Sequence, residues 1–480
     1  MSSSVKSGFS CVVFPFQFDG KCLVDEVFNA PVKKQNGKED HIWEPDKLKS
    51  YHMKESISSM LGLGTLYGDI GQIYTLRDSM RRELGIPDAR SSLQLSCRGR
   101  DTTIACKLPH VRMTVFDTGI GFLEFTFSDL PEDTADVVDL NYFLCEVKGD
   151  SNQLHYTKKL SKDEQEDVSL TLLDMMQKLT ASLGEVNDFD SRTGLRYVDN
   201  KPLIFSYLLL DRTDDDFGKL LFNLRTNFKA SYQVPQEQYD LQNAKGVFHP
   251  FDNVWWGTSL NATVCCAALT DNEKTNEFFS TSFPSNVRET YLQLFLLRQH
   301  QRYCMQKMQK RYSQAGAELL SVHGENVPDA YKQITALRER AIAFKLRCMF
   351  SDPSTVEHIN EYDDFLQNNL HIPQTMQVFS ESVEQLTQAA STLKERIDKH
   401  EQKQRDKQQR RRDNMIFGFT AVWTMLVGFD SAWDIAEKLT RRSIWFDTLW
   451  ILLPIVLALL PISTAIYDLV KERKDKDKDE

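Results

Sequence analysis

The sequence predicts an α/β cytosolic domain, then a long helical stalk and a two-helix transmembrane hairpin. Strand-like and helix-like apolar patterns alternate up to about residue 284, helical patterns prevail afterwards, and the longest uncharged runs lie near the C-terminus. The chain has 480 residues, more than a single domain usually has. Its mean hydropathy of −0.42 is typical of a soluble protein, but its apolar residues are concentrated at one end. The expected domains are 1–284, 285–413, 414–470 and a charged tail at 471–480.

Charge and cysteine content narrow the class of protein. A net charge of −10 argues against a nucleic-acid partner, because such proteins normally carry a basic face. The first residues lack the apolar core of a secretory signal. The nine cysteines form no CxxC pair and lie mostly in apolar runs, which is typical of reduced, buried thiols. We therefore expect the large domain to be cytosolic.

The first domain contains strand-length apolar runs and one clear hairpin. The runs lie at residues 9–16, 137–147, 203–210 and 254–269. Residues 111–116 and 121–127 flank Asp117-Thr118-Gly119, a glycine-bearing turn that predicts a β-hairpin. These patterns predict a sheet but do not reveal its strand order.

Helical signals begin inside this domain and prevail after it. Ser161 and Glu164 form a capping box before a helical apolar pattern that ends at Gly184, so we expect a helix there. The later helices are expected at residues 285–324, 328–350 and 355–370.

A heptad pattern follows Pro373. Its members alternate at spacings of three and four residues and are Met376, Phe379, Val383, Leu386, Ala390, Leu393 and Ile397. Such a seam faces another helix, so it predicts self-association in a homo-oligomer. The alternative is a long amphipathic helix that packs on its own domain.

The same register continues toward the C-terminus and becomes apolar with small residues. Its further members are Asn414, Gly418, Ala421, Met425 and Gly428. Small residues on one face allow transmembrane helices to approach closely. This face is the predicted lining of an ion path.

Two uncharged runs predict the membrane spans. Residues 448–467 are twenty uncharged residues, enough to cross a hydrocarbon core of about 30 Å. Residues 415–429 are only fifteen, but they follow the stalk and a basic run between Lys403 and Arg412. The lipid bilayer is thus an expected partner.

The distribution of charge predicts the orientation of this hairpin. Basic residues before the first span and in the tail place both termini in the cytosol, in a multi-pass protein of the cell's inner (plasma) membrane. The basic run is a topology signal and lipid-headgroup anchor, or it lines a pore mouth. Between the spans, Asp430, Asp434 and Glu437 share one helical face. They form an acidic ring at the outer entrance of an oligomer, or simply solvate a short loop.

The order of these elements resembles the CorA family of divalent-cation channels. The family signature is Gly-Met-Asn at the end of the first span, and the matching residues here are Gly428-Phe429-Asp430. The resemblance covers about 110 C-terminal residues in detail and the rest only in architecture. It implies a homopentamer that conducts Mg²⁺ or another divalent cation, although aspartate in place of asparagine puts magnesium selectivity in doubt.

The resemblance has two further implications. Acidic residues at cytosolic subunit contacts bind divalent ions in the family, which points to Glu361, Asp363 and Asp364; a solvated helix face is the alternative. Some divergent relatives are effectors of antiviral defence that respond to a nucleotide second messenger. A small-molecule or ion ligand of the cytosolic domain is therefore expected, in a pocket that the sequence does not reveal.

No catalytic motif supports an enzyme. Asp117-Thr118-Gly119 matches the aspartic-protease tripeptide, but it occurs once and a hairpin turn accounts for it. HExxH, Walker A, GxSxG and Rossmann patterns are absent from the sequence. The predicted function is an oligomeric channel gated by its cytosolic domain. The alternatives are a magnesium transporter and a non-conducting, membrane-anchored binding or scaffold protein.

Overall fold

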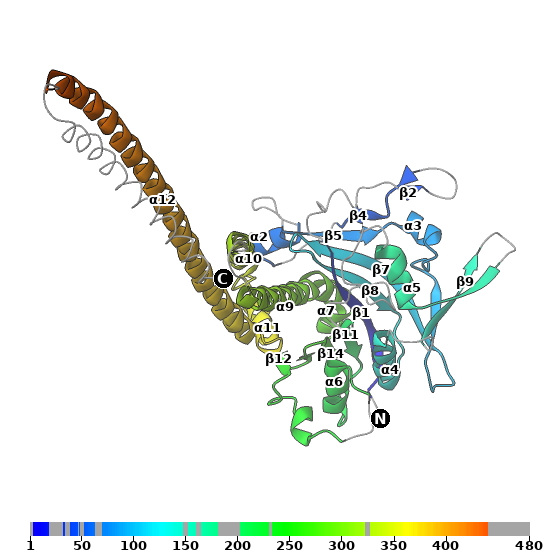
Figure 1. The fold of residues 1–480 in the computed structure, drawn as a ribbon. Coiled ribbons are helices and arrows are strands. Elements are labelled where there is room, and N and C mark those ends of the chain that lie inside the picture. Colours follow the sequence, from blue (N-terminus) through cyan, green and yellow to red (C-terminus); the bar gives the residue numbers. More distant parts are fainter. Residues whose placement is uncertain are drawn as a thin grey trace. The chain divides into compact units, whose positions relative to one another are not determined.

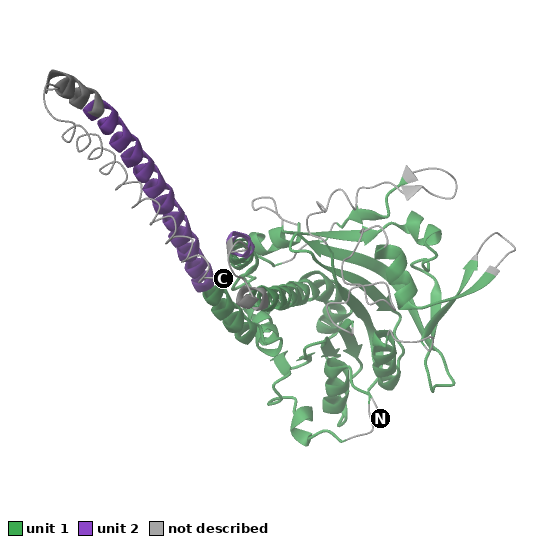
Figure 2. Cartoon of the chain, viewed as in Figure 1, with its two compact units in different colours: residues 1–320, 334–386 green, residues 321–333, 387–480 purple. Residues whose placement is uncertain are grey.

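The computed structural model describes most of the chain up to residue 439. The described residues are 3–18, 32–33, 39–46, 48, 52–62, 70–146, 152–159, 165–180, 202–229, 233–321 and 327–439. The chain divides into two compact units (Figure 2), one comprising 1–320 and 334–386 and the other comprising 321–333 and 387–480.

One mixed sheet organises the first unit (Figure 1). Its main path has the order β10-β9-β6-β7-β8-β1-β11-β14-β13-β12, and β4 and β5 extend it through β7. Among the described strands, only β11 and β14 pair in parallel. The strands are β1 Val5–Gln17, β4 Trp43–Pro45, β5 Gly71–Leu76, β6 Ser92–Ser96, β7 Ile104–Phe116, β8 Ile120–Ser128, β9 Gln153–Lys159, β10 Gln165–Leu170, β11 Leu203–Leu210, β12 Val247–Phe251, β13 Val254–Thr258 and β14 Ala262–Ala268. A separate two-stranded sheet comprises β2 Val32–Lys33 and β3 Glu39–Asp40.

Short helices cover one face of the large sheet. The helices are α3 Asp78–Glu83, α4 Thr134–Cys145, α5 Leu172–Thr180 and α6 Phe217–Thr226. Their apolar side chains form two core clusters with the strands. α3, α4 and α5 bury side chains with alternate strand residues such as Val12, Met113 and Phe125, and α6 does so with residues of β11, β13 and β14.

A long helix packs on the opposite face. Aromatic pairs link the two layers, because Phe116 stacks on His300 with ring centroids 3.8 Å apart and Phe205 meets Phe295 at 5.7 Å. The elements of this layer are α2 Glu55–Ser58, η1 Ser59–Leu61, α7 Glu273–Thr281, α8 Phe283–Asn286, the π-helical turn η4 Val287–Tyr291, α9 Leu292–Ser321, α10 Val327–Cys348 and α11 Glu357–Asn369. The last described helix is α12, Ile372–Leu439.

Several local predictions are confirmed. The run at 9–16 lies in β1, the run at 203–210 is β11, and the hairpin around Gly119 joins β7 to β8. Gly119 has a φ of +77°, a left-handed conformation that favours glycine in this turn. The run at 254–269 forms two antiparallel strands, β13 and β14.

One prediction in the first domain is wrong and another is only partly right. Residues 137–147 were predicted as a strand, but residues 137–145 belong to α4, because Asp133 caps that helix by accepting a hydrogen bond from the Ala135 amide at 2.9 Å. Of the helix expected after Ser161, residues 165–170 instead form β10, which pairs with β9, while Ser161, Glu164 and Gly184 lie outside the described residues. The helical part, α5, begins only after Thr171, whose amide donates to Asp174 at 2.8 Å.

The predicted transmembrane hairpin and multi-pass location in the plasma membrane are also wrong. Within the described ranges, which end at residue 439, no helix is both long and apolar enough to cross a bilayer. The physical reason in α12 is the short uncharged run at 415–429, which lies between Asp413 and Asp430 and falls short of the ~20 residues of a span. The second predicted span, at 448–467, and the tail at 471–480 lie outside the described residues.

The heptad residues of α12 pack within the same chain. Phe379, Leu386, Ala390 and Leu393 are buried. Phe379 stacks on Tyr312 of α9 and meets Phe344 of α10 edge-on, each with ring centroids 5.9 Å apart. At Phe379 the heptad seam therefore packs on its own domain, as the alternative to self-association expects. The homo-oligomer stays a prediction.

Candidate functional site

The predicted acidic metal site contains a buried ion pair. Asp363 of α11 is 1% exposed and receives two hydrogen bonds from Arg298 of α9, one of them from Nε to Oδ1 at 2.8 Å. Gln301 accepts from Arg298 at 2.8 Å, and the guanidinium lies 3.9 Å from the centroid of the Phe350 ring. Asp363 thus fastens α11 to α9 through a charge-assisted, bidentate contact.

The other predicted ligands do not join Asp363 in a cluster. Glu361 and Asp364 are exposed on α11, and burial together with the nearby Asp363 charge raises the pKa of Asp364. In the part of the chain that the structure describes, no group of three or more His, Cys, Asp or Glu side chains could hold a metal ion. The role of Glu361, Asp363 and Asp364 in divalent-cation binding stays a prediction from the resemblance.

The predicted pore residues all lie on α12. Asn414, Gly418 and Gly428 are exposed, whereas Ala421 and Met425 are half-buried. The helix also includes Phe429, Asp430, Asp434 and Glu437, and for these four the structure describes the backbone alone. The expected face of small residues is thus present on one helix, and its role in an ion path stays a prediction.

Large apolar side chains dominate the rest of the same segment. They are between 53% and 75% exposed and comprise Met415, Ile416, Phe417, Phe419, Val422, Trp423, Leu426 and Val427. We call this segment, residues 415–428, the apolar end. Met415, Phe419, Val422 and Leu426 follow the four-three-four spacing of a single helical face. Exposed apolar patches of this kind mark contacts with a protein or a membrane.

The two hydroxyl groups of the apolar end are satisfied inside the helix. They belong to Thr420, which donates to the Ile416 carbonyl at 2.8 Å, and Thr424, which donates to the Thr420 carbonyl at 2.7 Å. No charged residue occurs between Met415 and Gly428. Both hydroxyl groups can therefore leave water without losing a hydrogen bond, and the indole N–H of Trp423 is the remaining side-chain donor of the segment.

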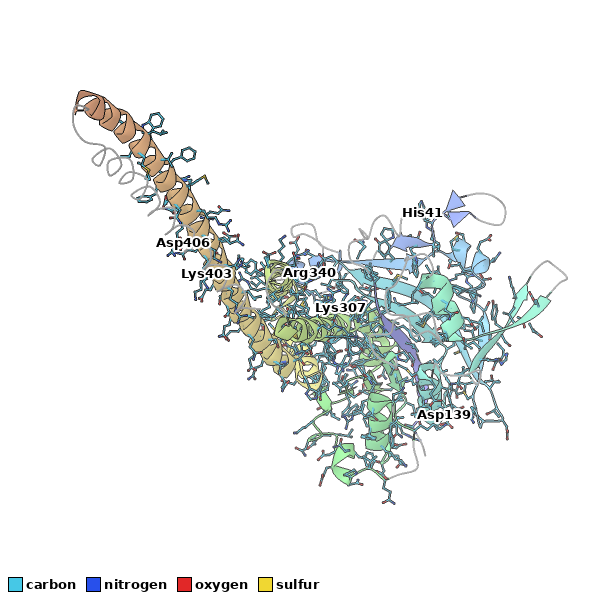
Figure 3. The ribbon with its side chains drawn as sticks, in the orientation of Figure 1. His41, Asp139, Lys307, Arg340, Lys403 and Asp406 are labelled. Atoms are coloured by element: carbon cyan, nitrogen blue, oxygen red, sulfur yellow. The ribbon has the colours of Figure 1, made fainter. Side chains whose placement is uncertain are left out.

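A basic run precedes the apolar end on the same helix. It holds six basic residues, Lys403, Arg405, Lys407, Arg410, Arg411 and Arg412, and one acidic residue, Asp406, which gives a net charge of +5. All of these side chains are exposed, and Lys403 and Asp406 project from α12 in Figure 3. α12 thus joins an exposed cationic surface to an exposed apolar one.

A second buried charge cluster, which no pattern in the sequence predicted, lies between the sheet and η4. Arg112 and Glu124 are direct cross-strand partners on β7 and β8, and both are almost fully buried. Asp46 pairs with Arg112 at 2.8 Å, and Arg288 of η4 donates to His110 Nε2 at 3.1 Å. Burial and three neighbouring arginines lower the pKa of His110 to about 4, so this imidazole is neutral at pH 7.

Glu124 makes the stability of this cluster depend on pH. Burial raises the pKa of Glu124 from 4.5 to about 7, opposed by Arg112 and by a 2.8 Å hydrogen bond from Thr114. The pKa of Glu124 is higher in the folded state than in the unfolded state, so protonated Glu124 stabilises the fold. This stabilisation is complete below pH 4.5 and is lost as the pH rises toward 7. We expect the stability of the native chain, relative to Glu124→Gln, to fall by up to about 3 kcal/mol over this window.

Urea titrations of both proteins at several pH values measure this difference. The buried histidines have lowered pKa values, so their contribution to stability changes with pH in the opposite direction. Comparison with Glu124→Gln removes this contribution, because both proteins share these histidines. A difference in stability that does not change between pH 4.5 and 7 would contradict the prediction.

The Asp117-Thr118-Gly119 turn is held by helices. Asp117 pairs with Arg347 of α10 at 2.7 Å. Lys307 of α9, which is labelled in Figure 3, donates to the carbonyls of Thr118 and Gly119 at 3.1 and 3.0 Å. Thr118 also lies 2.9 Å from His300 Nε2. These contacts give the turn a structural role, and the absence of enzymatic activity stays a prediction.

Comparison with known proteins gives weak structural similarity. No family model and no curated protein matches the chain. Among solved structures, the chain is similar to the CorA magnesium transporter of Methanocaldococcus jannaschii at 13% identity and a TM-score of 0.20, over 63% of this chain and 93% of that chain. A similarity this weak establishes neither a shared fold nor a shared function.

Proposed function

We propose that the chain is a non-conducting binding protein whose α12 attaches it to the surface of an anionic lipid bilayer. The observation that carries this proposal is the exposed apolar end of α12 directly after the exposed basic run. Anionic headgroups complement the basic run, while the interfacial region of the bilayer accommodates the apolar side chains.

The apolar contribution is the larger of the two. Full burial of a large apolar side chain contributes about 1.5–3 kcal/mol, so eight partly buried ones contribute roughly 10 kcal/mol. Each basic residue near an anionic surface contributes about 1 kcal/mol, and the net charge of +5 limits this term to about 5 kcal/mol. Salt should therefore weaken attachment without abolishing it.

Vesicle flotation tests this attachment. The native chain should float with vesicles of phosphatidylcholine and phosphatidylserine, and less with phosphatidylcholine alone. The Phe419→Glu and Trp423→Glu substitutions should each weaken partitioning about a hundredfold, because a charge in the apolar region costs about 3 kcal/mol.

Val378→Glu is the matched control. Val378 lies on the same helix and is 53% exposed, but it precedes both the basic run and the apolar end. This variant should float like the native chain. If the native chain remained in the aqueous fraction, or if Trp423→Glu floated equally well, the proposal would be wrong.

The remaining predictions from the sequence stand beside this proposal. A divalent-cation channel, a magnesium transporter and a defence effector gated by a nucleotide messenger have only the family resemblance as support. A ligand of the α/β domain is supported by its buried charges, among them Arg225.

A further inference from the structure

Among the described residues, two buried arginines of the first unit, Arg225 and Arg302, have no acidic partner within ion-pair distance. Arg225, in the last turn of α6, is 5% exposed. Its Nη2 donates to the backbone carbonyl of Gln238 at 3.2 Å and to the Gln238 side-chain oxygen at 3.0 Å. Its Nε is buried without a hydrogen-bond partner. Among the described residues, no carboxylate lies within ion-pair distance of this guanidinium.

Other buried arginines have an acid or neutral acceptors. Arg298 pairs with Asp363, Arg112 pairs with Asp46, and Arg302 donates to the Leu260 carbonyl and the Gln299 side chain. Arg225 differs from these in combining the lack of an acid with a buried Nε that has no partner; its described neighbours are Gln238 and the ring of Phe222, whose centroid lies 5.1 Å from its guanidinium carbon. Burial lowers the pKa of Arg225, and no neighbouring charge opposes this shift. An uncompensated buried charge is destabilising, so a neutral side chain would serve packing better.

Two glycines make room for the side chain of Arg225. A Cβ at Gly246 would lie 2.1 Å from Nη1 of Arg225, and a Cβ at Gly257 would lie 2.9 Å from its Cβ. Gly246 precedes β12 and Gly257 lies in β13, so the arginine occupies a space that the backbone leaves open. Lys245, which directly precedes Gly246, is exposed and adds positive charge beside this space.

We propose that Arg225 binds a phosphate-class oxyanion, which takes the place of the Gln238 side chain. Gln238 belongs to the short helix η3, Gln236–Tyr239, and is exposed, so its amide can move into solvent. Its departure frees Nη2 beside Nε, and these two donors form the fork that arginine presents to phosphate. In the structure the amide oxygen of Gln238 thus stands where a ligand oxygen would bind.

Phosphate titration of the full-length chain, followed by thermal unfolding, tests this site. Inorganic phosphate should raise the unfolding temperature in a saturable way, beyond a chloride control of equal ionic strength. Arg225→Met should weaken phosphate binding about ten- to a hundredfold, because it removes charge-assisted hydrogen bonds. Arg82→Met is the control, since Arg82 is an exposed arginine that pairs with Asp88.

Gln238→Ala provides a second variant, on the surface, that should fold whether or not Arg225→Met does. It removes the competing amide and should tighten phosphate binding several-fold. Adenosine monophosphate is the second probe; binding of phosphate alone identifies a free anion, and binding of both identifies a phosphoryl group on a larger ligand. No saturable effect of either probe, or an unchanged effect in Gln238→Ala, would overturn the proposal. Neither result would bear on attachment of α12 to vesicles.

Discussion

Asp363→Ala should destabilise the first unit by about 3–5 kcal/mol, because it leaves the Arg298 guanidinium buried without its counter-charge. Arg298 is completely buried, and its other contacts are the Gln301 side chain, the Phe350 carbonyl and the Phe350 ring. None of these neutralises the charge. The free energy of unfolding in urea, followed by circular dichroism, measures the loss.

The neighbouring carboxylate supplies the control for this experiment. Asp364 is exposed on the same helix, so Asp364→Ala should change stability by no more than about 0.5 kcal/mol. The double variant Arg298→Met, Asp363→Leu should recover much of the loss, because a buried apolar pair replaces a buried ion pair at little cost. Equal effects of Asp363→Ala and Asp364→Ala would show that the ion pair does not stabilise the fold.

Trp256→Ala should cost about 3–5 kcal/mol by creating a large cavity between the sheet and the helices. Trp256 of β13 is 1% exposed. Its ring centroid lies 4.7 Å from that of Tyr291 in η4 and 4.4 Å from that of Tyr362 in α11. One side chain therefore joins three elements, and urea unfolding should report the loss as a lower midpoint.

Trp423→Ala is the matched control, because Trp423 is 70% exposed on α12. It should leave the free energy of unfolding within about 0.5 kcal/mol of the native value. Trp256→Phe should give an intermediate loss, since a phenyl ring fills part of the space. If Trp256→Ala unfolded at the native midpoint, the aromatic contact between β13 and the helices would not contribute to stability.

Local patterns in the sequence predicted those elements that depend only on residues close together in the chain. The turn at Gly119 set the β7–β8 hairpin, because its left-handed conformation is a property of that residue. The heptad spacing predicted four buried residues of α12, namely Phe379, Leu386, Ala390 and Leu393, whereas its other three members are half-buried. Such periods depend only on backbone geometry, so they can be read without knowing what packs against them.

Where one stretch of sequence fits two kinds of element, the sequence was not sufficient to choose between them. An apolar run such as 137–147 fits a strand or a buried helix equally well. The N-terminal cap by Asp133 and packing against the sheet favour the helix α4. The uncharged run at 415–429 resembled a span by its position, whereas its length and charged flanks leave α12 short of one. The second predicted span lies outside the described residues.

The sequence by itself thus determined the strand runs, the hairpin and the buried stripe of α12. Only the tertiary structure decided the partners. It paired Asp363 with Arg298, 65 positions apart, and set Phe379 against Tyr312 of the same chain. It also left Arg225 buried without an acid between Gly246 and Gly257. The physical reason is that a period is a local property, whereas a partner depends on which distant segments the packing brings together.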